Sequence, residues 1–439
     1  MGSSSIENTE IDQNKSEGFL NKMAKKIVLA SMGKLNIGHL VIEDRSACID
    51  TNSIIKPEIY HFGQTKENAK YIAYIYVEES SAYKDVCLNS SIGAGEAYMQ
   101  KRWTTPNLLD VIRLMVMNLE QVNDMDSKRP IWTRIGAKLF HSFNSNTQQR
   151  SKKNISAHYD LGNDFFSLFL DKTMMYSAAM YPHQEASLEE AAIFKLDRIC
   201  QKLELSPQDH LLEIGTGWGG LAIHAATHYD CKVTTTTISK EQYDFAKQRV
   251  EEAGLGDRVV VLMQDYRELT GQYDKLVSIE MIEAVGHRFY DSYFRQCGSL
   301  LKSTGLMLIQ AITIADQRYA YAKSSVDFIQ RYIFPGGCLP SNEVIAQNVS
   351  RKTDMQIVSM EDITEHYADT LADWRHEFTQ QINQVKAQGF DDVFCRMWEF
   401  YLCYCEGGFR ERVISTAHFV MAKPNFRFQP VVARSESFL

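Results

Sequence analysis

The chain has 439 residues, 44% of them hydrophobic, and a formal net charge of -8 from 47 Lys and Arg against 55 Asp and Glu. This length allows two or three domains with cores of their own, and the acidic balance argues against nucleic acid as a partner. The nine cysteines show no CxxC spacing and the twelve histidines no paired metal-ligand spacing, so we expect reduced thiols and no metal site.

The first apolar segment predicts an amphipathic helix. Apolar residues recur at helical spacing from Phe19 to Leu29, and Lys22, Lys25 and Lys26 fall between them. Such a helix either packs on its own domain or contacts a membrane surface, and the sequence leaves both alternatives open.

The rest of the N-terminal part predicts a small α+β domain that ends at a linker. Short alternating runs between residues 37 and 86 predict strands, and residues 107–123 return to helical periodicity. Residues 144–154 are polar, lack apolar periodicity and hold three basic residues, which predicts a linker. We therefore expect an N-terminal domain over 1–143, which contacts lipid, a membrane or a second copy of the chain as a homodimer, and a larger domain over 155–439.

Beyond the linker, predicted strands alternate with helices such as 219–229 and 240–253. This alternation predicts an α/β fold, a doubly wound, mainly parallel sheet with helices on both faces. Residues 385–415 form an aromatic-rich helical region, whose rings either fill a core or wall a lipid tunnel. The predicted strands cover 210–215, 231–238, 258–263, 273–280 and 305–314.

A glycine-rich turn, EIGTGWGG over 213–220, follows the first of these strands and opens a helix. Glycines there allow a tight turn and let a ligand approach the backbone beside the helix N-terminus. Dinucleotide-binding folds also place a carboxylate at the end of the second strand, where this chain has Thr236, Thr237, Ile238 and Ser239. The acidic residue is instead Glu213, before the first glycine. This pattern favours S-adenosylmethionine, with its ammonium and sulfonium groups, and leaves NAD as the second choice.

Several further segments of the chain form a recognisable set together with the glycine-rich turn. They are HYDLGNDFF (158–166), YS (176–177), EIGTGWGG (213–220), TTTISKEQ (235–242), QDYREL (264–269), EMIEAVGH (280–287), YIFPGGCLPS (332–341) and CEGGFRER (405–412). Through these segments, residues 150–425 or so resemble a known family, the cyclopropane-fatty-acyl-phospholipid synthases. The resemblance implies a Rossmann-like methyltransferase fold in which a helical region over about 365–415 covers the acyl chain.

The resemblance implies transfer of a methylene unit from S-adenosylmethionine to the cis double bond of an unsaturated acyl chain in a membrane phospholipid, which forms a cyclopropane ring. Two alternatives stay open: C-methylation without ring closure, which gives a methyl-branched chain, and a non-catalytic lipid-binding relative. No stretch approaches ~20 consecutive apolar residues, and no secretory signal is apparent. We therefore expect a cytoplasmic enzyme that associates reversibly with the inner membrane surface.

By the same resemblance, the methyl donor contacts the Tyr-Ser pair, the glycine turn and the loops after the second and third strands. Without the family, a plain strand end and helix start would be the preferred interpretation of Thr237, Ile238 and Gln242. The implied donor contacts are Tyr176, Ser177, Gly215, Gly217, Thr237, Ile238, Gln242, Tyr266 and Arg267, and Glu213 joins them from the pattern of the turn.

Family members hold a bicarbonate ion as the base, in a clasp of Cys, Glu, His, the main chain of Ile, and Tyr. The matching positions here include Glu283, Ile312 and Tyr367. Two positions depart: Ala178 replaces the Cys and removes one donor, and Gln310 replaces the His and cannot itself relay a proton at neutral pH.

One cysteine also matches a family position. Cys405 corresponds to a residue that is sometimes given a catalytic role, although a buried packing thiol is at least as good an interpretation.

Overall fold

The computed structural model describes residues 4–47, 56–120 and 161–428. The linker predicted over 144–154 and the motif residues 158–160 lie outside the described residues, so the domain boundary at this point stays a prediction. The contacts divide the chain into two compact units. The first comprises Met1–Asp171, Gln317–Gly337 and Thr364–Ser415, and the second comprises Lys172–Asp316, Cys338–Ile363 and Thr416–Leu439.

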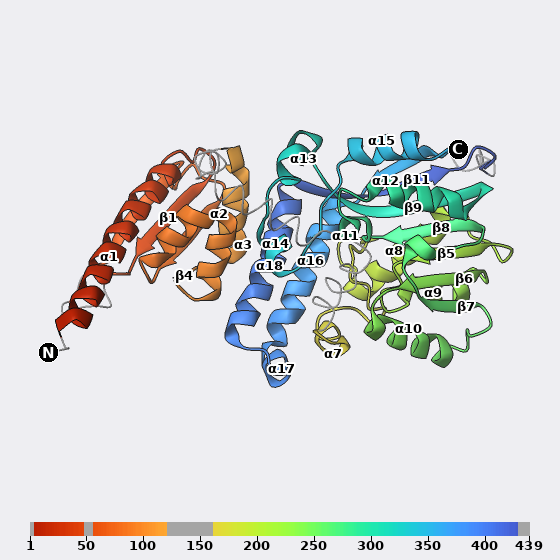
Figure 1. The fold of residues 1–439 in the computed structure, drawn as a ribbon, viewed down its shortest axis with the longest axis horizontal. Helices are drawn as coiled ribbons and strands as arrows, with labels where there is room; N and C mark the ends of the chain where they lie inside the picture. The colour runs from red at the N-terminus through yellow and green to blue at the C-terminus, as the bar shows by residue number, and fades with distance from the viewer. Residues whose placement is uncertain (1–3, 48–55, 121–160, 429–439) are drawn as a thin grey trace, which may run out of the picture. The chain divides into compact units, whose positions relative to one another are not determined.

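The second unit contains a seven-stranded sheet in the order β10-β11-β9-β8-β5-β6-β7 (Figure 1). The pairs β5–β6, β5–β8, β6–β7 and β8–β9 are parallel, and β10 and β11 pair antiparallel. The sheet confirms the prediction of a mainly parallel, Rossmann-like fold. Its strands are β5 (His210–Ile214), β6 (Lys232–Thr237), β7 (Val259–Met263), β8 (Tyr273–Ile279), β9 (Leu301–Ile314), β10 (Gln356–Asp362) and β11 (Ile414–Ala422).

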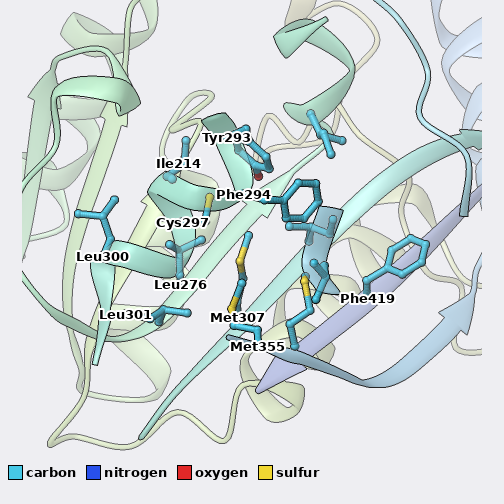
Figure 2. Close-up of a cluster of buried hydrophobic side chains, with 14 of the residues drawn as sticks. Ile214, Leu276, Tyr293, Phe294, Cys297, Leu300, Leu301, Met307, Met355 and Phe419 are labelled. Atoms are coloured by element: carbon cyan, nitrogen blue, oxygen red, sulfur yellow. The ribbon is translucent and has the colours of Figure 1, made fainter. Parts of the chain in front are cut away.

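Helices cover both faces of this sheet because its strands are apolar on both sides. Leu211 and Val277 point into a core with α8 and α9, while their neighbours Leu212 and Leu276 point into a second core with α12 and α15. Figure 2 shows the second core, where side chains of α12 meet those of the strands. The elements around the sheet are α8 (Leu188–Lys202), α9 (Gly220–His228), α10 (Lys240–Glu252), the 3₁₀ turn η1 (Tyr266–Glu268), α11 (Ile282–Val285), α12 (Tyr290–Leu300) and α15 (Asn342–Lys352).

The first unit is built on a four-stranded sheet in the order β2-β1-β3-β4. β1 and β3 are parallel, and the other two pairings are antiparallel. The strands are β1 (His39–Asp44), β2 (Glu58–Gly63), β3 (Ile72–Val77) and β4 (Trp103–Thr104), and the helices of this segment are α1 (Ser4–Met32), α2 (Ser81–Met99), α3 (Leu108–Met117) and α7 (Asn163–Phe166).

C-terminal helices of the chain belong to this same unit. The hydroxyl of Tyr98 on α2 donates to Glu399 on α18 at 2.8 Å, and the guanidinium of Arg113 on α3 pairs with Glu411 at 2.6 Å. The buried rings of Trp398 and Phe400 fill this core. The helices are α13 (Asp316–Ala322), α14 (Phe328–Tyr332), α16 (Thr364–Gln380), α17 (Ile382–Ala387) and α18 (Asp392–Arg410). The helical region predicted up to residue 415 is therefore helical only to Arg410, and β11 begins at Ile414.

Candidate active site

The candidate site of the second unit lies at the carboxyl edge of β5, β6 and β8. The turn after β5 holds Gly215, Gly217 and Gly219 at φ values of 103°, 52° and 85°, a region that disfavours side-chain-bearing residues. The main-chain N–H groups of Gly215 and Thr216 both donate to the carbonyl of Thr236 on β6, at 3.0 and 3.1 Å. A Cβ atom at Gly217 would meet no atom within 4 Å, so the turn leaves open space above its backbone.

The end of β6 closes one side of this space. Thr237 is buried and its hydroxyl donates to Oε1 of Gln242 at 2.9 Å, while Ser239 caps the N-terminus of α10. Ile238 lies between them and is partly buried. The structure thus brings these predicted donor-binding residues together at the strand end, through contacts that an ordinary helix start also makes.

Glu213 is buried at the end of β5 and accepts a hydrogen bond from the hydroxyl of Thr235 at 2.5 Å. Burial raises the pKa of Glu213 to about 8, although the charge of Lys195 opposes the rise. Lys195 is itself buried and donates to Ser177 Oγ at 2.7 Å, beside Tyr176. A buried lysine that no sequence motif marks thus binds the predicted Tyr-Ser pair, and its charge acts on Glu213.

Beyond β7, the predicted contacts Tyr266 and Arg267 form a 3₁₀ turn. The main-chain N–H of Arg267 donates to the carboxylate of Asp265, and the guanidinium binds both carboxylate oxygens at 2.7 and 2.8 Å. The guanidinium therefore holds the turn together. Tyr266 packs edge-on against Tyr293, and burial raises its pKa.

Glu283 lies on α11, directly after β8. Its Oε1 accepts from the main-chain N–H of Ile312 at 2.5 Å, so these two residues of the predicted clasp bind each other. Its Oε2 is buried and has no hydrogen-bond partner among the described residues. Burial, together with the charge of Glu280, raises the pKa of Glu283 to about 8. This carboxyl is therefore largely protonated at neutral pH.

A second carboxylate, Glu280, lies beside it at the end of β8. Its Oε1 accepts from the main-chain N–H of Ala178 at 3.0 Å and from Nε2 of Gln310 at 2.7 Å. Ala178 has no side-chain donor, but its main-chain N–H takes part in the clasp by donating to Glu280. Gln310 is buried and connects to His418, whose Nε2 lies 2.9 Å from Oε1 of Gln310.

The glycine turn, where the methyl donor is predicted to bind, adjoins the loop that carries Glu280 and Glu283. The hydroxyl of Ser278 on β8 donates to the carbonyl of Ile214 at 2.9 Å, and a Cβ atom at Gly215 would lie 3.6 Å from the side chain of Met281. The loop that carries the two carboxylates thus borders the glycine turn.

Two other predicted site residues belong to the first unit. Tyr367 on α16 is buried and stacks on Phe409, with ring centroids 4.4 Å apart. Cys405 is on α18, and burial raises the pKa of its thiol, which therefore stays protonated at neutral pH and favours the interpretation as a packing residue.

The sequence analysis missed Lys195, Glu280 and His418. Two of them had a local signal, and the first is Lys195, which lies in the apolar stripe of α8 with Ala191, Ala192, Leu196 and Ile199. Glu280 ends a buried parallel strand, where ligands of such sheets bind. Within the described residues we find neither a cluster of metal-ligating side chains nor a helix long and apolar enough to cross a membrane.

The parallel sheet, the glycine turn with open space above it and the polar strand ends fit a nucleoside-bearing methyl donor, and they define a class I, S-adenosylmethionine-dependent methyltransferase. Comparison with known proteins narrows this class. Residues 146–419 match the family model of mycolic acid cyclopropane synthetase, and the chain belongs to this family.

Individual relatives agree with this assignment. The chain is 40% identical over 327 residues to tuberculostearic acid methyltransferase UfaA1 of Mycobacterium tuberculosis. The aligned residues make up 73% of this chain and 76% of the relative. It is 36% identical over 387 residues to cyclopropane-fatty-acyl-phospholipid synthase of Escherichia coli, or 86% and 97% of the two chains. The crystal structure of mycolic acid cyclopropane synthase CmaA1 with SAH and CTAB matches with a TM-score of 0.58 and 32% identity, over 62% of this chain and 98% of that one. The protein is therefore an enzyme that uses S-adenosylmethionine, and the non-catalytic alternative is dropped.

Proposed function

We propose that the enzyme transfers a methylene unit from S-adenosylmethionine to the cis double bond of an unsaturated acyl chain in a membrane phospholipid, forming a cyclopropane ring. The observation that carries this proposal is the clasp of Glu283, Ile312 and the buried Gln310 next to the glycine turn. Support for the substrate class comes from the E. coli relative, whose name specifies acyl chains of phospholipids.

The proposed chemistry makes three demands on the chain. An alkene is a weak nucleophile, so the glycine turn and the end of β6 must hold the donor on a near-attack path. The carbocation that follows must be kept from water, which the buried surroundings of Gln310 favour. A base must finally take a proton from the added methyl group, and the carboxyls of Glu280 and Glu283 beside the glycine turn are candidates for this role.

A second product is favoured by one feature of the clasp. Ala178 and Gln310 replace the Cys and His of the family pattern, and the relative UfaA1 is named a methyltransferase rather than a ring-forming enzyme. If the proton leaves a neighbouring carbon of the acyl chain instead of the added methyl group, the product is methyl-branched and unsaturated. Both products add 14 daltons to the chain, so mass alone does not separate them.

We also propose that α1 contacts the bilayer surface. Ala24 and Val28 are buried against the first unit, while Phe19, Met23 and Ile27 are 64%, 47% and 47% exposed. Exposed Lys22 and Lys26 flank these apolar side chains, which suits a surface of anionic phospholipids. The third predicted basic residue, Lys25, is neutralised by Asp44 and Glu58, each at 2.6 Å. The basic residues Arg150, Lys152 and Lys153 lie outside the described residues.

The direct test is incubation of the purified protein with S-adenosylmethionine and vesicles of cis-unsaturated phospholipid, followed by mass analysis of the acyl chains. We expect a product heavier by 14 daltons, with the upfield proton signals of a cyclopropane ring. Vinyl or methyl-branch signals instead would favour the second candidate. Absence of any product across lipid head groups and double-bond positions would reject both.

A further inference from the structure

Glu280 has an unusual backbone conformation for its residue type. It follows β8 with φ at 47°, in the left-handed region that side-chain-bearing residues adopt at a cost. Its main-chain N–H donates to the carbonyl of Gln310 at 2.8 Å, so the same residue of β9 that binds its side chain also fixes its backbone. This geometry turns the carboxylate toward the clasp.

The surroundings of Glu280 stabilise its ionised form. Its Oε1 receives two N–H donors, the main chain of Ala178 and the side chain of Gln310. Ala178 and Gln310 stand at two positions of the clasp in which relatives are expected to hold a bicarbonate ion. At a third position of the clasp, the main-chain N–H of Ile312 donates to Glu283. Side-chain carboxylates of the chain itself thus engage the donors that would otherwise bind an anion.

A series of contacts orients Gln310 for this role. The ammonium of Lys202, which pairs with Glu361, lies 2.6 Å from Nδ1 of His418. Because the ammonium can only donate, Nδ1 accepts, and Nε2 of His418 carries the proton that it donates to Oε1 of Gln310. The amide of Gln310 must then point its NH₂ group at Glu280.

The two carboxyls of the clasp have different states. The charge of Glu280 and burial raise the pKa of Glu283 to about 8, so Glu283 is the largely neutral member of the pair. Two neighbouring carboxyls commonly share one proton in this way. Because its Oε1 receives two N–H donors, Glu280 is the member of the pair that is suited to stay ionised and to accept a proton.

We propose that the carboxylate of Glu280 is the proton acceptor of the reaction and makes the enzyme independent of bicarbonate. This inference rests on the proposed function. After the methyl group has bonded to one alkene carbon, a C–H bond of that methyl breaks. Its electron pair forms the ring bond to the cationic neighbour, and the proton moves to Glu280, which later releases it to water.

The experiment compares turnover in buffer freed of carbon dioxide with turnover in added bicarbonate, for the wild type and for Glu280→Gln and Glu280→Gly. We expect the wild type to be equally active in both buffers. Glu280→Gln keeps the size of the side chain but not its basicity, and we expect turnover to fall about 100-fold in both buffers. Glu280→Gly suits the left-handed backbone and opens the anion position, so added bicarbonate should raise its low turnover at least several-fold.

Glu204→Gly is the matched control, because Glu204 also has a positive φ, of 49°, but lies after α8 and outside the clasp. It should behave as the wild type does, and binding of S-adenosylmethionine by calorimetry checks that each variant is folded. A wild type that requires bicarbonate, or full activity in both Glu280 variants, would overturn the inference alone. No product from the wild type in either buffer would overturn the proposed function and the inference together.

Discussion

The main-chain N–H of Ile312 donates to Oε1 of Glu283 at 2.5 Å, while Oε2 of the same carboxyl is buried without a partner among the described residues. A carboxylate in this position would leave a charged oxygen uncompensated, which is costly. A protonated carboxyl, in contrast, donates from Oε2 toward whatever occupies the clasp. The raised pKa of Glu283, about 8, agrees with this neutral form.

The first prediction therefore concerns Glu283→Gln. An amide is close to isosteric with a protonated carboxyl: its oxygen accepts from Ile312 and its NH₂ group donates in place of Oε2–H. We expect kcat to fall by no more than about tenfold, whereas Glu283→Ala, which leaves the N–H of Ile312 unpaired, should lose about 100-fold. Steady-state kinetics with vesicle substrate measure both. Equal, complete losses would indicate that the ionised carboxylate of Glu283 is needed.

The second prediction tests the orientation of Gln310 by His418. Replacing His418 with Leu removes the donor to Oε1 of Gln310, so the amide is free to turn its NH₂ group away from Glu280. We expect kcat to fall about tenfold while KM for S-adenosylmethionine stays within about twofold. His418→Gln retains an N–H donor and should recover most of the activity. A rise in KM in both variants, with kcat unchanged, would contradict a positioning role.

The strands that carry the site were predictable from the sequence because they are buried on both faces. Runs such as LLEI in β5 and LVSI in β8 have few interpretations other than a buried strand. β10 was missed because its residues are almost all exposed and show no alternation. β11 was missed because its apolar run follows α18 after a short turn, in which Arg412 has φ at 53°.

The site itself was predictable only where a residue stood in a motif. Glu283, Gln310 and Ile312 could be placed together through the family resemblance. His418 and Lys202 could not, because 108 and 216 residues separate the partners of their hydrogen bonds and no local pattern marks either residue. The role of the Ala178 backbone was hidden for another reason, since every residue type other than proline offers the same N–H group.

The third prediction concerns stability and pH. Folding raises the pKa of Glu213 from its ordinary value of 4.5 to about 8. Between these values the folded state keeps a proton that the unfolded chain releases, so the contribution of Glu213 to stability is fully present below about pH 4.5 and is lost as pH rises through 8. Glu213→Gln is neutral throughout this range.

We therefore expect the free energy of unfolding of the variant to fall less than that of the wild type between pH 5 and pH 8 (about the range over which Glu213 changes charge). Urea denaturation of both proteins without the methyl donor provides the comparison, and contributions of all other groups cancel in the difference. Parallel pH profiles of the two proteins would show that Glu213 is not protonated in the folded state.

The fourth prediction tests the packing of the first unit. A Cβ atom at Gly95 on α2 would lie 2.5 Å from the ring of Phe328 on α14 and 3.2 Å from Phe400 on α18. We expect Gly95→Ala to destabilise the protein by about 1–3 kcal/mol, because the ring must shift within a filled core.

The matched control is Gly18→Ala on α1, where an added Cβ atom meets nothing within 4 Å. Alanine has the higher helix propensity, so this variant should be unchanged or more stable by up to about 1 kcal/mol. Thermal unfolding measures both changes. A Gly95→Ala variant as stable as the wild type would mean that α2, α14 and α18 do not pack as closely as described.

The last prediction concerns the contact of α1 with membranes. Replacing the exposed side chains of Met23 and Ile27 with Ser removes apolar surface that we propose enters the bilayer interface. Each change should reduce the binding free energy by about 1 kcal/mol, so the double variant should partition to anionic vesicles about 30-fold more weakly than the wild type. Ile193→Ser on α8, which is 43% exposed in the wild type, is the control and should leave partition unchanged. Vesicle cosedimentation at low and high salt gives both the apolar and the charge contribution, since binding by Lys22 and Lys26 weakens as salt screens them. Partition that is unaffected by the double variant would assign membrane contact to another surface of the protein.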